Sequence, residues 1–410
     1  MSPGEIENAV KSLTSYDWSA EPTNADVNTD INHDAQSEAL NDFCERRDIS
    51  HSLTSGDFLE AIGATKNGQL TKGGLLFLGT ESAIRDKLGD YEYRFSWKTL
   101  SGQLVINDVW AGCLWDTIKR AKGHFADCNS EKAYSYEDRE FKVPLLDPIA
   151  FHEAYLNALV HRDYSSEGMV SVTFAGKRIT ITSPGIFFGG VTADNIAMHE
   201  PRHRNKSLAR MLMTYHLVDR AGMGVLRMGL RSLMYGRAFP EFREDSESVE
   251  VVMEGEYLRP AVAVLAIDNE EHYGIPELLI LNSVFEDGVV SVNELIRRLT
   301  RLVDDPWDHV QNAVDAIQGV ELCGTRDGIF VRVRSGWLKF FKCPTLFRVS
   351  STSKKHVDLF TFLKKHGSVS SADIHPILGS AHQSYTSRFL AEAKYTKRIG
   401  NGPSSRWSLT

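Results

Sequence analysis

Hydrophobic positions change their spacing along the chain, and each spacing predicts a different kind of element. Alternating apolar residues in YEYRFSWKTL (91–100) and QLVINDVW (103–110) predict two strands, followed by an amphipathic helix near 110–125. Two more alternating runs, within MVSVTFAGKRITITSPG (169–185), meet at Gly176 and predict a β-hairpin. Helices and strands that alternate in this way pack as layers, so we expect an α+β fold in the middle of the chain.

Other segments complete this picture. Residues 15–36 are polar and rich in Asn, Asp and Ser, which predicts a loop or a partly disordered arm. Beyond them, the periodicity predicts helices near 55–64, 147–161, 206–218 and 220–235, and a strand at 248–255.

The order of predicted helices and strands changes after about residue 260. One helix, a short strand, two helices and two strands are expected up to residue 345, and 346–410 repeats that plan. This order is typical of winged helices, a variant of helix-turn-helix. The chain then divides into an acidic N-terminal segment (1–50), an α/β linker module (51–145), an α+β domain (146–258) and two tandem winged helices (259–345 and 346–410).

Composition and charge indicate a cellular compartment and a possible polyanionic partner. The chain has 410 residues and a net charge of −8, with five scattered cysteines and no CxxC pair. No apolar run is long enough to span a bilayer, so we expect a cytoplasmic protein without membrane contact. Residues 1–50 are acidic and 346–410 are basic, which favours either a polyanion site at one end or two solvated surfaces.

EAYLNALVHRDY (153–164) carries the first candidate chemistry. Glu153, Asn157 and His161 are four residues apart, so they share one stripe of a helix. The Asn carbonyl can ligate Mg²⁺, and the Glu can orient or deprotonate a water that attacks a phosphate. The alternative is the solvated edge of an ordinary amphipathic helix.

Glycines downstream suit a phosphate ligand. Gly222 and Gly224, in RAGMGV, precede a predicted helix, so backbone amides there can face phosphates. HEPRH (199–203) matches the HExxH zinc motif, but Pro201 opposes the helix which that motif needs. We therefore reject a zinc protease and interpret this stretch as a basic loop.

The order of these motifs resembles the GHKL ATPase (Bergerat) fold. More narrowly, it resembles the ATP-binding domain of bacterial RecG-like, AlbA–Schlafen-associated regulators with C-terminal winged helices. The resemblance is carried by EAYLNALVHRDYS (153–165), ITSPG (181–185), RHRNKSLARML (202–212), DRAGMGVLRM (219–228) and FPEF (239–242). It implies a GHKL-type α/β sandwich over 146–258 that binds ATP and Mg²⁺.

The resemblance also assigns roles. It implies that Glu153 is the catalytic base and that Asn157 binds Mg²⁺ and nucleotide. Ser183 and Gly185 fall at the box that touches adenine, and Gly222 and Gly224 at the box near the phosphates. Ser183 stands where such proteins usually carry an Asp. For the remaining candidates two interpretations stay open, a ligand-facing network or structure: His161, Asp163 and Arg204.

The basic tail completes the hypothesis. Its expected recognition helix and flanks carry side chains suited to phosphate and base edges: Lys354, Lys355, Gln383, Ser384, Tyr385, Arg388, Lys394, Lys397, Arg398 and Arg406. Three acids in the first winged helix would repel phosphate and favour protein docking: Asp304, Asp305 and Asp308. We expect an ATP-binding, nucleic-acid-associated regulatory or anti-phage defence protein, with a homodimer or a protein partner as further possibilities. The alternative is a non-enzymatic assembly protein with a degenerate nucleotide site.

Overall fold

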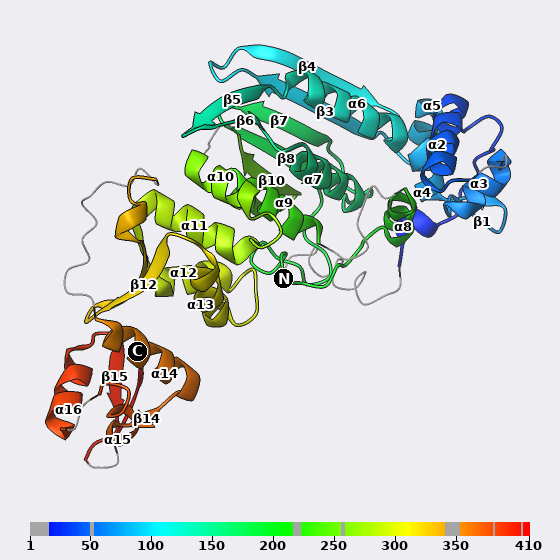
Figure 1. Ribbon diagram of the computed structural model, residues 1–410. Helices are drawn as coiled ribbons and strands as arrows, with labels where there is room; N and C mark the ends of the chain where they lie inside the picture. Colours follow the sequence, from blue (N-terminus) through cyan, green and yellow to red (C-terminus); the bar gives the residue numbers. More distant parts are fainter. Residues whose placement is uncertain are drawn as a thin grey trace. The chain divides into compact units, whose positions relative to one another are not determined.

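The computed structural model (Figure 1) describes residues 16–49, 53–215, 223–255, 259–340, 353–379, 382–402 and 405–410. Contacts divide the chain into two units, Met1–Leu258 and Arg259–Thr410. Within the described ranges, no helix combines the length and the hydrophobicity needed to cross a bilayer.

A six-stranded sheet is the centre of the first unit, in the order β4-β3-β7-β8-β10-β9. Its strands are β3 (Glu92–Lys98), β4 (Leu104–Ala111), β7 (Val170–Ala175), β8 (Arg178–Pro184), β9 (Glu241–Glu244) and β10 (Ser248–Glu254). Neighbours are antiparallel except β3 and β7, which are parallel. A parallel pair needs a long crossover, and here the crossover holds α6 (Leu114–Cys128), α7 (Pro148–Val160) and the β5–β6 hairpin (Glu131–Tyr136, Arg139–Pro144).

Alternation along the strands explains the core. Tyr93, Phe95 and Trp97 point to one face of β3 and are almost fully buried, as are Val172 and Phe174 on β7. Helices α6 and α7 lie along the sheet (Figure 1), and α9 (Gly224–Met234) packs on α7. The strands expected at 91–110, the hairpin about Gly176 and the helix near 147–161 are confirmed.

Helix α7 begins where its sequence predicts. The Asp147 carboxylate caps it by accepting hydrogen bonds of 2.9 Å from the amides of Ile149 and Ala150, and Pro148 occupies the first turn. Arg231 pairs with the same carboxylate at 2.9 Å. Helix α7 is buried on most sides, so its polar residues are exceptions in an apolar setting.

Residues 16–36 are packed rather than disordered, so that part of the expectation is wrong. The Trp18 ring stacks on Tyr164 with centroids 5.0 Å apart, and Ile31 is buried. Asp17 accepts hydrogen bonds of 2.8 Å from the amide and hydroxyl of Ser207. A few apolar anchors with distant partners leave no periodic signal in a polar segment.

Most of the remaining helices of the first unit have nine residues or fewer, and α2 has 14. They are η1 (Trp18–Ala20), α2 (His33–Arg46), α3 (Ser55–Ala61), α4 (Lys72–Leu78), α5 (Glu81–Lys87) and α8 (Lys206–Thr214), with a small β1–β2 hairpin (Thr65–Lys66, Gln69–Leu70). The predicted boundaries at 50/51 and 145/146 fall inside this unit, because β3 and β4 extend the sheet that β7 begins.

The second unit has two similar halves. The first half holds α10 (Pro260–Asp268), α11 (Ile275–Asp287), β11 (Val289–Ser291), α12 (Val292–Leu299), α13 (Pro306–Ala316), β12 (Val320–Thr325), β13 (Gly328–Val333) and η2 (Ser335–Trp337). The second holds α14 (Lys354–His366), β14 (Val369–Ser370), α15 (Ser371–Ile374), α16 (Gln383–Glu392), β15 (Thr396–Ile399) and β16 (Arg406–Leu409). Each half forms one three-stranded sheet, β11-β13-β12 or β14-β16-β15. The element order is the expected one, except that α10 and η2 in the first half were not expected.

Candidate functional site

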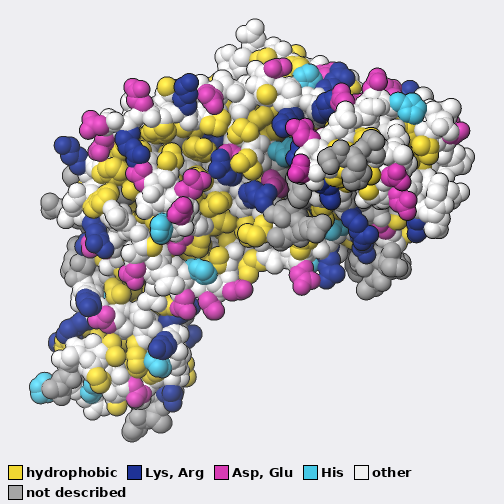
Figure 2. Space-filling model, turned by 45° about the vertical axis from the view of Figure 1, so that its right-hand side comes forward, with side chains coloured by type: hydrophobic (Ala, Val, Ile, Leu, Met, Phe, Trp, Pro, Cys, Tyr) yellow, Lys and Arg dark blue, Asp and Glu magenta, His cyan; other side chains and the backbone are white. Residues whose placement is uncertain are grey.

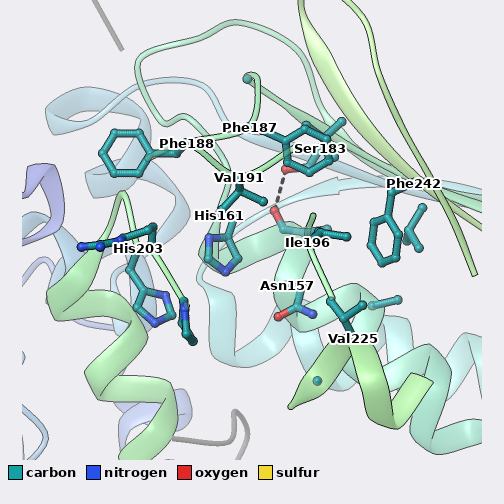
Figure 3. Close-up of a pocket in the computed structure, with 18 of the residues that line it drawn as sticks. Asn157, His161, Ser183, Phe187, Phe188, Val191, Ile196, His203, Val225 and Phe242 are labelled. Carbon is teal, nitrogen blue, oxygen red and sulfur yellow. Dashed lines mark hydrogen bonds between the residues drawn. The ribbon is translucent and has the colours of Figure 1, made fainter. Parts of the chain in front are cut away.

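A cavity opens between α7, the ends of β8 and β10, the loop 185–203 and the start of α9. Figure 3 shows Asn157 from α7, His161 at the C-cap of α7, Ser183 from β8 and Val225 from α9 around it. Glu153 lines the same cavity. The structure therefore brings the polar stripe of α7 to a pocket wall, and not to a solvated helix edge.

Glu153 is buried and already has a cationic partner. Its side chain is 7% exposed and pairs with the Arg227 guanidinium of α9. Gly224 lies directly beside it, because a Cβ at this position would come 2.8 Å from Glu153 Oε2 and 3.5 Å from Asn157 Nδ2. Glycine thus lets the start of α9 approach both polar groups of α7.

Asn157 is the free polar group of this cluster. Within the part of the chain that the structure describes, its side-chain amide makes no hydrogen bond. Helix α9 begins close by, and its N-cap residue Met223 makes no side-chain cap. Amides in the first turn of a helix lack partners inside the helix and attract anions. An amide oxygen, a carboxylate and a helix start form a donor set that suits Mg²⁺ and phosphate oxygens.

The other end of the cavity is apolar around one hydroxyl. Ser183 Oγ donates a 2.6 Å hydrogen bond to the Ala158 carbonyl, in the last turn of α7 (dashed line in Figure 3). Apolar side chains of β8, β9, β10 and α9 surround this end: Ile181, Phe242, Val249, Val251 and Met228. Because the Ser183 hydroxyl donates its proton to the Ala158 carbonyl, its oxygen can only accept a hydrogen bond from a ligand.

Two histidine rings form a side wall. His161 stacks on His203 with centroids 5.2 Å apart and an interplanar angle of 17°. His161 lines the cavity, and desolvation lowers its pKa, with His203 and Arg204 adding to the effect. Desolvation also lowers the pKa of His203. Both rings are therefore neutral near pH 7.

Asp163 and Arg204 fix the loop that covers the cavity and do not line it. They pair with each other, and Arg204 also donates a 2.9 Å hydrogen bond to the Ile186 carbonyl. Gly185 has a φ of +103°, and a Cβ there would lie 2.6 Å from the Asp163 Cβ. These contacts are structural; they hold the loop that carries Phe187 and Phe188 over the cavity (Figure 3).

Residues 168–253 match a known family model. Its description is "Putative ATP-dependent DNA helicase recG C-terminal", and the match supports ATP binding by this part of the chain. The match begins after α7. The cavity is therefore lined both by strands within the matched stretch and by Glu153, Asn157 and His161, which precede it. Residues 10–94 match a domain of unknown function, and no curated protein matches the chain.

A solved structure also resembles the whole chain. The DIP2311 protein from Corynebacterium diphtheriae aligns over 99% of this chain and 72% of its own, with a TM-score of 0.61. The two sequences are 20% identical, so the likeness concerns the fold alone.

Sequence reasoning missed Arg227: it lies within DRAGMGVLRM (219–228), but no role was assigned to it, because it reaches Glu153 only through the packing of α9 on α7. Gly222 lies outside the described residues. HEPRH (199–203) carries no helix, as Pro201 led us to expect. Among the described side chains, no group of three or more His, Cys, Asp or Glu could hold a metal ion by itself.

In the second unit, several of the predicted DNA-binding side chains are engaged within the protein. Lys394 pairs with Asp327 at 2.8 Å, and Arg406 donates to the Ser368 carbonyl. Lys355 lies over the Tyr385 ring, 5.0 Å from its centroid. Arg398 is exposed and donates a 3.2 Å hydrogen bond to the Gly402 carbonyl. The remaining side chains are exposed: Lys354, Gln383, Ser384, Arg388 and Lys397. On the face shown in Figure 2, acidic and basic side chains of the described residues are interspersed.

Proposed function

We propose that the first unit is a GHKL-type domain that binds ATP with Mg²⁺ in the cavity beside α7. The observation that carries the proposal is the free Asn157 amide, which shares one cavity with Ser183 and lies against the start of α9. The match of residues 168–253 supports the same nucleotide.

Each end of the cavity suits one end of ATP. The apolar end around Ser183 fits a flat base, and the Ser183 oxygen accepts from an exocyclic amino group such as that of adenine. The start of α9 at Gly224 suits phosphates, and the amide oxygen of Asn157 suits Mg²⁺. Bound Mg²⁺ would supply neutralisation and orientation of the phosphate charges.

The Glu153–Arg227 pair favours binding over hydrolysis. A general base must reach a water with its lone pairs free, whereas the Glu153 carboxylate already faces a guanidinium. We therefore propose that ATP turnover is slow. Single-turnover hydrolysis by wild type and by Arg227→Met measures this, and a fast wild-type rate would contradict it.

Calorimetry with ATP–Mg²⁺ tests the site. Wild type should bind and Asn157→Ala should bind at least 10-fold more weakly, equivalent to about 1.4 kcal/mol. Gln103→Ala, an exposed amide in the turn between β3 and β4, is the matched control and should bind as wild type does. Equal affinity of Asn157→Ala and wild type would remove the assignment.

For the second unit we propose two winged helices, of which the second binds DNA, in a nucleic-acid-associated regulatory or defence protein. The exposed Lys397 and Arg398 of β15 and Arg388 of α16 support this. Removal of Lys397 and Arg398 should weaken duplex DNA binding by the full chain and reduce its salt dependence. Lys394→Ala should change the salt dependence less, because Lys394 pairs with Asp327. No binding at low salt would instead favour the assembly protein with protein-docking winged helices.

A further inference from the structure

Strand β4 lies at an edge of the six-stranded sheet, because β3 is its only neighbour among the strands that the structure describes. It is eight residues long, and three of its apolar side chains are about half exposed: Leu104 (54%), Val105 (56%) and Val109 (46%). An edge strand of this kind offers unpaired backbone groups beside apolar side chains to another strand.

Soluble proteins usually protect such edges with charge, proline or short strands. The opposite edge of this sheet follows that rule, since β9 (Glu241–Glu244) has only four residues, three of them charged. In β4 the one ionisable side chain is Asp108, and it is held by Arg120 at 2.7 Å and His124 at 2.7 Å. Strand β4 therefore lacks the charge and the short length that protect β9; its one irregularity is the register shift to β3 between Trp97 and Lys98.

We propose that two copies of the chain pair through β4, antiparallel, about a two-fold axis at Asn107. In an antiparallel pair, side chains directly opposite each other lie on the same face. A two-fold axis at Asn107 places Val105 of each copy opposite Val109 of the other copy. The Asn107 residues of the two copies then face each other across the axis. Every exposed valine then has an apolar partner, and two sheets join into one.

The order of the side chains Val105, Asn107 and Val109 along β4 indicates that the partner is a second copy of the chain. It reads the same in both directions about Asn107, as an isologous interface requires. The side chains of Val105, Asn107 and Val109 are uncharged, and Arg94 of β3 donates a 3.0 Å hydrogen bond to Asn107 Oδ1, so a basic peptide gains no ion pair there. Head-to-tail growth would instead pair β4 with β9, where Glu241, Arg243 and Glu244 face solvent in part. The structure thus favours a closed dimer over a filament.

Mass measurement by light scattering or sedimentation tests the proposal on the full chain. Wild type should have twice the chain mass of 45.9 kDa. The double variant Val105→Lys/Val109→Lys places like charges opposite each other and should be monomeric. Ile267→Lys changes a similarly exposed apolar residue on α10 and should remain dimeric.

Cross-linking then tests the register. Asn107→Cys should form a covalent dimer with a short thiol-specific linker, because the two thiols face each other across the axis. Val105→Cys should not, since four residues separate its two copies along the strands, roughly 13 Å. A monomeric wild type, a mass that keeps rising with concentration, or an Asn107→Cys yield no higher than the wild-type background would each overturn the proposal.

Discussion

Gly224→Ala is the substitution that most directly probes how α9 meets α7. The added Cβ would lie 2.8 Å from Glu153 Oε2, closer than such atoms normally approach, and 3.5 Å from Asn157 Nδ2. Glu153 cannot move away freely, because it is buried and paired with Arg227. The start of α9, which we assign to phosphate, must then shift away from Glu153 and from Asn157, which we assign to Mg²⁺.

The substitution has two opposing effects on stability. Overpacking of this kind costs about 1–3 kcal/mol, whereas alanine in place of glycine in a helix stabilises by about 0.5–1 kcal/mol. We therefore expect the free energy of unfolding to fall by no more than about 2.5 kcal/mol, so that the variant remains folded. Its affinity for ATP–Mg²⁺ should fall at least 10-fold, or about 1.4 kcal/mol.

Thermal unfolding with and without ATP–Mg²⁺ separates the two effects. A ligand at 100 times its dissociation constant stabilises wild type by about 2.7 kcal/mol, and Gly224→Ala should lose most of that shift. Gly123→Ala is the matched control, because position 123 lies in α6 with nothing within 4 Å of an added Cβ. It should be slightly stabilised and bind normally. A wild-type ligand shift in Gly224→Ala would refute the placement of the phosphates at α9.

Three further outcomes follow from the same region. Ser183→Ala removes the donor to the buried Ala158 carbonyl, so the free energy of unfolding in urea should fall by about 1–3 kcal/mol. Arg204→Met leaves Asp163 without its buried partner; limited proteolysis should cut the loop 185–203 faster, and an unchanged cleavage rate would show that the pair does not hold the loop. Burial lowers the pKa of His152 from 6.5 to about 4, so the unfolded chain binds the proton first and stability should decline as pH falls from about 6.5 towards 4. In His152→Gln that decline, measured by urea unfolding at several pH values, should be shallower.

Periodicity predicted the strands of the sheet and helix α7 because their patterns are local. The hairpin at Gly176 is predicted by the alternation of its two strands and the turn between them. Helix α7 is predicted by Asp147 and Pro148 at its start and by the apolar run that follows them. The short strand β9 and the β5–β6 hairpin were not predicted, since few of their residues are buried and their alternation is weak.

The site was predicted only in part, for a similar reason. Spacing of four brought Glu153, Asn157 and His161 to one stripe, and the stripe does line the cavity. Spacing cannot show that Arg227 neutralises Glu153, or that Asp163 and Arg204 engage each other, because these partners lie 41 and 74 residues apart. Whether the assigned side chains bind nucleotide remains a prediction that the calorimetry above addresses.

The carboxylate of Asp17, which holds the first turn of α8 through Ser207, has a consequence for how the chain can be divided. A fragment starting at residue 146 would lose that cap, the Trp18–Tyr164 stack and the strand β3 that flanks β7. Such a fragment would expose a new sheet edge and should aggregate rather than fold. The matched stretch at 168–253 is thus shorter than the piece that we expect to fold on its own.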